Sequence, residues 1–130
     1  MREIFNLIPK NIQFAGKTIL DAGSGEQSLD FLTSQNPLTI YSVSIDAKEV
    51  QKNKLKYNSH NNIKFIQSDL TKGSLNKEFD IVFCDYLFAG VEGFSPFKSL
   101  DALKNLKASL KSDGTMVIVG LEPLVDAKTL

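Results

Sequence analysis

The fold of this chain is decided by the stretch Ile19-Leu20-Asp21-Ala22-Gly23-Ser24-Gly25-Glu26-Gln27. An apolar run ends at an acidic residue, and two glycines then turn the chain toward a helix. Because glycine has no Cβ, the backbone of such a turn can adopt positive φ and can lie directly against a ligand. An acidic residue before the turn would repel a pyrophosphate, but it suits a ligand end that carries an ammonium or sulfonium cation. The stretch therefore predicts a strand, a ligand-binding turn and a helix.

Strand-like and helix-like segments alternate along the rest of the chain. The strand-like runs are residues 17–21, 39–46, 63–69, 79–85 and 115–120. Helical patterns cover residues 2–14 up to an interruption at Pro9, and then residues 26–35, 47–58 and 99–111. Asp113 and Gly114 predict a turn before the last strand. This alternation is typical of βαβ units and predicts an α/β fold with a parallel sheet.

Four acidic residues stand where predicted strands end, namely Asp21, Asp46, Asp69 and Asp85. Ligands of such sheets bind beyond the carboxyl ends of the strands. A hydrophobic core requires no acid at these positions, so the pattern favours a binding site. Capping of loops is the alternative interpretation, because Asp is common in turns.

Composition limits the classes of protein that fit. A chain of 130 residues that is 42% hydrophobic and 23% charged matches one domain, residues 1–130. Basic and acidic residues both total 15, so net charge gives no attraction to nucleic acid or to an anionic membrane. Cys84 is the only cysteine, which excludes a disulfide framework and a cysteine-rich zinc site. With no apolar signal region at the start, the composition predicts a cytoplasmic protein.

Four sequence elements, in order, resemble the class I S-adenosylmethionine-dependent methyltransferases. They are Ile19–Gly25, Asp46 closing the second strand, Gln67-Ser68-Asp69 closing the third, and Phe79–Asp85 in the fourth. The resemblance spans residues 17–120. It implies a three-layer αβα Rossmann-like sandwich with strand order 3-2-1-4-5, and a methyltransferase that uses S-adenosylmethionine to methylate an unidentified acceptor.

The resemblance also implies a place for each motif on the cofactor. Gly23 and Gly25 would lie beneath the methionine part, with Asp21 near its ammonium. Asp46 would accept bonds from both ribose hydroxyls, which suits a carboxylate. Ser68 and Asp69 would meet the adenine edge, while Ala47 and Leu70 would border the ring. The implied cofactor-binding set is Asp21, Ala22, Gly23, Ser24, Gly25, Gln27, Asp46, Ala47, Ser68, Asp69, Leu70 and Asp85.

The chain departs from the family pattern at three points. Gln27 stands where a third glycine is frequent, which would narrow the turn or move the carboxylate end of the cofactor. The fourth strand is followed by Asp85-Tyr86-Leu87-Phe88 and not by the Asn/Asp-Pro-Pro-Tyr/Phe pattern of enzymes that methylate amino groups of nucleic acids. The family's sixth and seventh strands are missing, so a truncated enzyme and a non-catalytic cofactor-binding module are alternatives.

Two other cofactor classes fit the same residues less well. A dinucleotide fingerprint needs Gly-x-Gly-x-x-Gly/Ala, and counting from Gly23 its last position holds Ser28. Asp46 fits both cofactor classes, whereas Asp21 and Asp69 belong to the methyl-donor interpretation. Aminopropyl transfer uses a related fold with more acids after the fourth strand than Asp85 alone.

The end of the fourth strand supplies the candidate catalytic residues, and the fifth strand leads to a prediction about assembly. Methyl transfer needs the acceptor held in line, and it needs a base only where the nucleophile must lose a proton. The candidate catalytic residues are Asp85 and Tyr86, although an aromatic wall beside the cofactor is an equal interpretation of Tyr86. The apolar run of residues 115–121 would form an edge of the sheet, so we expect a homodimer or a further segment to cover it.

Overall fold

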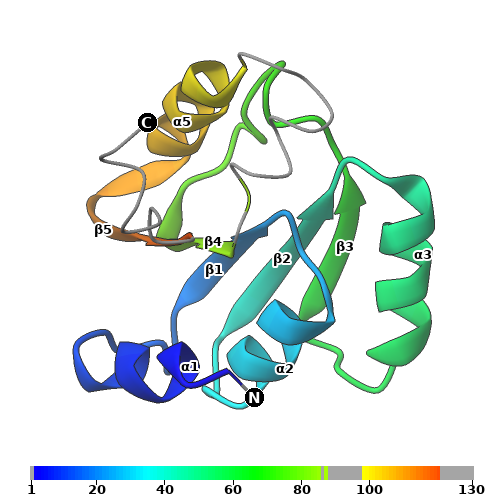
Figure 1. Ribbon diagram of the computed structural model, residues 1–130, viewed down its shortest axis with the longest axis vertical. Helices are drawn as coiled ribbons and strands as arrows, with labels where there is room; N and C mark the ends of the chain where they lie inside the picture. The colour runs from blue at the N-terminus through cyan, green and yellow to red at the C-terminus, as the bar shows by residue number, and fades with distance from the viewer. Residues whose placement is uncertain (1, 86, 88–97, 121–130) are drawn as a thin grey trace, which may run out of the picture.

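One five-stranded parallel sheet forms the centre of the molecule. A computed structural model describes residues 2–85, 87 and 98–120 (Figure 1). The order of the strands is β3-β2-β1-β4-β5, and every neighbouring pair is parallel. This order confirms the prediction. The strands are β1 (Thr18–Ala22), β2 (Thr39–Ser44), β3 (Ile63–Gln67), β4 (Phe79–Asp85) and β5 (Leu110–Val119).

Helices cover both faces of the sheet. Figure 1 shows α2 in front of the sheet with α1 to its lower left, α3 beside β3, and α5 at the upper left beside β4 and β5. The resulting helix–sheet–helix layering is the predicted αβα sandwich. The helices are α1 (Ile4–Leu7) with a following 3-10 turn (Ile8–Lys10), α2 (Glu26–Thr33), α3 (Ala47–Lys56) and α5 (Ser99–Ala108).

Alternate residues of the central strands face two separate cores. In β4, Ile81 and Phe83 join the core beneath α1 and α2, whereas Val82 and Cys84 join the core that contains Leu106 of α5. A strand buried on both faces must be apolar on both, which is why residues 81–84 read as a continuous apolar run. Cys84 is buried, and burial raises the pKa of its thiol to about 12.

Aromatic packing holds the N-terminal segment against the sheet. The ring of Phe5 in α1 stacks on Phe31 of α2, with centroids 4.7 Å apart. Phe31 in turn stacks on Phe83 of β4 at 5.7 Å, and Phe14 meets Phe31 edge-on at 5.4 Å. All four rings are almost fully buried. This cluster places α1 next to the carboxyl end of β4, where the candidate site lies.

Two predicted boundaries next to β5 were wrong, and β2 and β3 end two residues before Asp46 and Asp69, which were expected to close them. The helix predicted over residues 99–111 ends at Ala108, and the strand predicted from Thr115 begins at Leu110. Phe79 pairs with Leu110 and Ile81 pairs with Thr115, so residues 111–114 bulge opposite one residue of β4. The turn-forming pair before Thr115 therefore interrupts the strand without ending it.

The N-terminal helix is shorter than its sequence pattern suggests. Helical periodicity over residues 2–14 yields only α1 and the 3-10 turn that contains Pro9. Proline has no backbone N–H and cannot continue the α-helical ladder. Among the described residues, no helix has the length and hydropathy needed to cross a membrane.

Candidate functional site

The glycine-rich turn joins β1 to α2 at the carboxyl edge of the sheet. Its first glycine, Gly23, has φ +74°, and a Cβ built there would lie 2.9 Å from Cδ1 of Leu87. The turn is fixed to β2, because the backbone N–H groups of Gly23 and Ser24 both donate to the Val43 carbonyl, at 3.0 and 2.8 Å. Gly25 is the N-cap of α2, and no atom lies within 4 Å of a Cβ built on it. The first glycine is required by the turn, and the second leaves bare main chain exposed.

Asp21 lies beneath this turn and is fully buried. Its Oδ2 accepts hydrogen bonds from Ser24 Oγ at 2.6 Å and Ser28 Oγ at 2.7 Å, and Ser42 Oγ donates to Ser24 Oγ at 2.7 Å. Its Oδ1 is buried without a hydrogen-bond partner among the described residues. Burial raises the pKa of Asp21 to about 7 against the opposing effect of the two serine bonds, and nearby Asp85 raises it further.

Ser28 has a structural role that the sequence analysis did not find. Its hydroxyl donates to Asp21 and accepts from the backbone N–H of Gly25 at 3.1 Å, so it links the buried acid to the start of α2. This is the position at which a dinucleotide fingerprint needs Gly or Ala. Ser24 and Ser42 complete the same chain of hydroxyls. A pattern of serines around a buried acid is the sequence signal that could have identified it.

Asp46 and Asp69, two more of the strand-end acids, accept hydrogen bonds from backbone N–H groups of this chain. Asp46 is the N-cap of α3 and accepts from the N–H of Lys48 at 2.9 Å. Asp69 accepts from the N–H and the hydroxyl of Thr71, at 2.9 and 2.6 Å, and the hydroxyl bond is the largest of the effects that lower its pKa. In both side chains the bonds fall on Oδ1. Capping therefore accounts for the hydrogen bonds of Oδ1 in each acid, whereas Oδ2 accepts no hydrogen bond from the described residues.

The ends of β2 and β3 lie side by side. The residues predicted to contact the ribose and the adenine therefore lie at one carboxyl edge of the sheet. Ser44 pairs with Gln67, and the N–H of Ser68 donates to the Ser44 carbonyl at 3.0 Å. Asp46 and Ala47 are exposed beyond β2, whereas Leu70 is buried beyond β3. Ala22, the last residue of β1, is also fully buried. The roles of these residues toward a ligand stay predictions.

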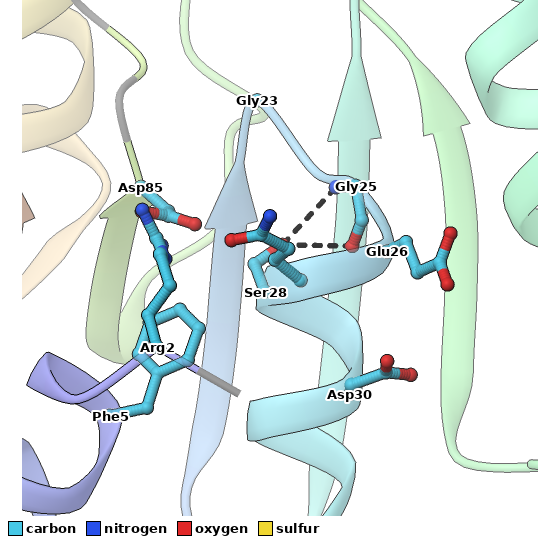
Figure 2. A pocket seen from close by; sticks show the side chains of 9 residues that line it. Arg2, Phe5, Gly23, Gly25, Glu26, Ser28, Asp30 and Asp85 are labelled. Carbon is cyan, nitrogen blue, oxygen red and sulfur yellow. Dashed lines mark hydrogen bonds and ion pairs between the residues drawn. The ribbon is translucent and has the colours of Figure 1, made fainter.

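A cavity of about 840 Å³ opens between the glycine-rich turn, α1 and the end of β4 (Figure 2). The predicted cofactor residues Gly23, Gly25, Gln27 and Asp85 line it. The remaining residues of the predicted cofactor set do not line it. The cavity therefore corresponds to the part of the site predicted for the methionine end of the cofactor and for the acceptor.

Two further residues of the cavity wall, Arg2 and Phe5, were missed by the sequence analysis. Arg2 forms an ion pair with Asp85 Oδ1, and its guanidinium carbon lies 4.5 Å from the centroid of the Phe5 ring. The signal that could have found it is composition, because Arg2 is the only arginine among the 15 basic residues of the chain. Tyr86, the second predicted catalytic residue, lies outside the described residues. Among the described residues, no group of three or more His, Cys, Asp or Glu side chains could hold a metal ion.

Comparison with known proteins gives the class to which this fold and turn belong. Residues 20–118 match the family described as "Methyltransferase domain". The chain therefore belongs to the methyltransferase domain family. No significant match occurs among curated proteins.

Several solved methyltransferase structures have the same fold. The complex of DhpI with SAH superposes with a TM-score of 0.68 at 16% identity, covering 85% of this chain and 51% of that one. A TehB-like SAM-dependent methyltransferase from Corynebacterium glutamicum gives 0.67 at 22% identity, covering 86% and 59%. The O-MT region of StiE gives 0.71 at 19% identity, covering 88% and 42%. The chain thus spans roughly two fifths to three fifths of the length of these structures, and the likeness concerns the fold.

Proposed function

We propose that this chain binds S-adenosylmethionine and transfers its methyl group to an acceptor. The observation that carries the proposal is the turn at Gly23 and Gly25, which exposes bare main chain to a cavity within a domain of the methyltransferase family. The solved structures named above include one described as a complex with SAH and one described as SAM-dependent. These descriptions support the choice of ligand.

The residues of this chain fit the parts of that ligand. The free Oδ2 of Asp46 offers an acceptor for ribose hydroxyls, while its Oδ1 keeps the cap of α3. Asp69 and Ser68, on the adjoining strand end, offer acceptors for the adenine edge. Gly23, Gly25 and Gln27 line the cavity that would hold the methionine end. The buried Oδ1 of Asp21 beneath the turn favours a cationic ligand above it.

Bound S-adenosylmethionine would supply a methyl carbon already activated by a sulfonium. The lone pair of the acceptor would form the new bond to that carbon as the carbon–sulfur bond broke, and the electron pair of the broken bond would stay on sulfur. Phe5 and the glycine-rich turn would form an apolar wall that excludes water and holds the acceptor in line. We propose Asp85 and Tyr86 for contact with the acceptor, and for taking its proton where it has one to lose.

A dinucleotide fits these residues less well. The position that its fingerprint reserves for Gly or Ala holds Ser28, whose hydroxyl is used on both sides, by Asp21 and by Gly25. Replacing that hydroxyl by hydrogen would leave the buried acid with one donor fewer. Ser28 therefore supplies a hydrogen bond to Asp21 beneath the turn, and a carboxylate at that place does not favour a pyrophosphate.

We further propose that the protein acts in the cytoplasm and as a homodimer through β5. A single, buried cysteine suits a reducing compartment. The dimer rests on the open edge of the sheet and is developed below with its test.

Transfer of labelled methyl groups tests the proposed activity. The full chain would be incubated with methyl-tritiated S-adenosylmethionine and with separate pools of small metabolites, proteins and RNA. We expect label to appear in one pool, which also identifies the class of acceptor. Binding of the cofactor with no transfer to any pool would instead indicate the non-catalytic module, and failure to bind it would contradict the proposal altogether.

A further inference from the structure

The cavity beside the glycine-rich turn has charged residues of both signs in its wall. Among the described residues that line it, Arg2 is the only basic one, and the acidic ones are Glu26, Asp30 and Asp85. Glu26 pairs with Lys56, and Asp30 accepts a bond from the Tyr57 hydroxyl. Figure 2 shows these two carboxylates on the far side of α2 from Arg2, whereas Arg2 extends toward Asp85 and the turn. On the Arg2 side of α2, the charged residues that line the cavity are therefore Arg2 and Asp85.

The amino-acid end of S-adenosylmethionine carries one carboxylate and one ammonium. Asp21, beneath the turn, can account for the ammonium, but a carboxylate in the same cavity needs a cation. We propose that Arg2 binds the carboxylate of the amino-acid end of the S-adenosyl ligand, and that Asp85 positions its guanidinium. This inference rests on the proposed function, because it assumes that the cavity holds that end of the ligand.

The geometry of Arg2 suits this role. A guanidinium carries five N–H donors in a planar fork and can bind two carboxylates together, which a lysine ammonium does less well. The chain uses lysine at every other basic position and arginine only here. The Arg2 side chain is three-quarters buried, and that of Asp85 is buried except for 8% of its surface. A carboxylate bound at this depth would be screened little by salt.

The surroundings hold Arg2 in place before any ligand binds. Its guanidinium lies over the Phe5 ring, and Phe5 is stacked on Phe31 within the core. The ion pair with Asp85 links the N-terminal segment to the end of β4 across 83 positions of sequence. A cation fixed from two sides loses little conformational freedom on binding, which is the physical advantage of preorganisation.

Two ligands that differ only in the carboxylate test the assignment. Calorimetry of the full chain would compare S-adenosylmethionine with its decarboxylated form, in the wild type and in Arg2→Gln, Arg2→Lys and Lys111→Gln. We expect the wild type to bind the carboxylate-bearing ligand about 10-fold to 100-fold more tightly, as for a hydrogen-bonded charge pair. Arg2→Gln should abolish that preference, and Arg2→Lys should keep part of it. Lys111→Gln is the matched control, since it removes an ion pair with Asp80 away from the cavity.

The outcomes separate this inference from the proposed function. Equal losses for both ligands in Arg2→Gln would make Arg2 a structural residue, and unchanged affinities would remove it from the site; either result overturns the assignment. 5′-Methylthioadenosine, which lacks the amino-acid end, checks that each variant retains a folded site. A wild type that binds both S-adenosyl ligands equally also overturns the assignment, whereas one that binds no adenosyl compound overturns the proposed function together with it.

Discussion

Asp21 combines complete burial with bonds to only one of its two carboxylate oxygens. Its pKa rises from 3.8 to about 7, mainly because burial penalises the charged form. The negative charge of Asp85 adds to this rise, and Asp21 in turn adds to the effect of burial that raises the pKa of Tyr57 and of Cys84. The residue is therefore sensitive to pH in a way that an exposed acid is not.

The pH dependence of stability should report this residue directly. Below pH 3.8 both folded and unfolded states hold the proton, so its contribution is fully present. As pH rises from there to about 7, only the unfolded state releases the proton, and the folded state loses stability, on the order of a few kcal/mol in total. In Asp21→Asn this loss is absent. Thermal unfolding of both proteins across that range should show the stability of Asp21→Asn increasing relative to that of the wild type as pH rises.

The difference between the two proteins matters more than either curve. Asp69 and Asp80 have lowered pKa values and contribute stability that is lost as pH falls, so they add an opposite slope to both proteins. Subtracting the curves isolates Asp21. A constant difference at every pH would contradict the raised pKa.

Asp46 has two roles that a pair of substitutions can separate. Asp46→Ala removes both the cap of α3 and the proposed acceptor for the ribose hydroxyls. It should lower the free energy of unfolding by about 1 kcal/mol and cost about 1–3 kcal/mol of binding. Asp46→Asn keeps a good N-cap but replaces one oxygen by an amide nitrogen, so stability should be kept while binding weakens. Denaturant unfolding and calorimetry with S-adenosylhomocysteine give the two numbers, and an Asn variant with wild-type affinity would reduce Asp46 to a cap.

At the scale of elements, the glycine-rich turn makes different demands at its two glycines. Gly23→Ala must adopt φ +74° with its methyl group 2.9 Å from Leu87, so we expect a loss of about 1–2 kcal/mol or more in unfolding free energy. Gly25→Ala has extended backbone and open space, so its stability should stay within about 1 kcal/mol of the wild type. The new methyl group instead enters the cavity and should weaken ligand binding. Unfolding and binding measured on both variants would contradict this division if Gly25→Ala bound as tightly as the wild type.

The elements differ in how far their sequence determined them. β4 was predicted with its observed bounds, because its apolar residues 81–84 suit burial on both faces and the run ends sharply at Asp85. The start of β5 was not, because the polar residues 111–114 bulge from a strand that is anchored at Leu110 by its pairing with Phe79. That pairing is a tertiary contact with no local signal.

The candidate site divides in the same way. Gly23 and Gly25 were found from their spacing in one local motif, and the structure places both in the cavity wall. Arg2 was not found, because its partner lies 83 residues away and only the aromatic packing of α1 brings the two together. Ser24 and Ser28 were not predicted as hydrogen-bond donors to Asp21, because the place of that acid in the sequence does not show that it is buried.

For the whole molecule, the open side of β5 leads to a prediction about assembly. In the described part of the chain, β5 pairs only with β4, and Ile118 on it is half exposed. An apolar strand with free N–H and C=O groups invites pairing with another copy. We expect light scattering to give twice the chain mass of 14.4 kDa, and Ile118→Lys to shift the protein toward the monomer.

Leu55→Lys is the matched control, since it places the same charge on an exposed leucine of α3, away from the edge. This control should leave the dimer intact. A wild-type monomer whose amides at residues 115–119 exchange slowly would show that something other than a second copy covers the strand.

The central claim is that the turn after β1 holds an S-adenosyl ligand and not a dinucleotide, and one calorimetric comparison tests it most directly. The full chain would be titrated with S-adenosylhomocysteine and, separately, with NAD under the same conditions. We expect saturable binding of S-adenosylhomocysteine that Gly25→Ala weakens, and no binding of NAD. Binding of NAD without binding of any S-adenosyl compound would contradict it.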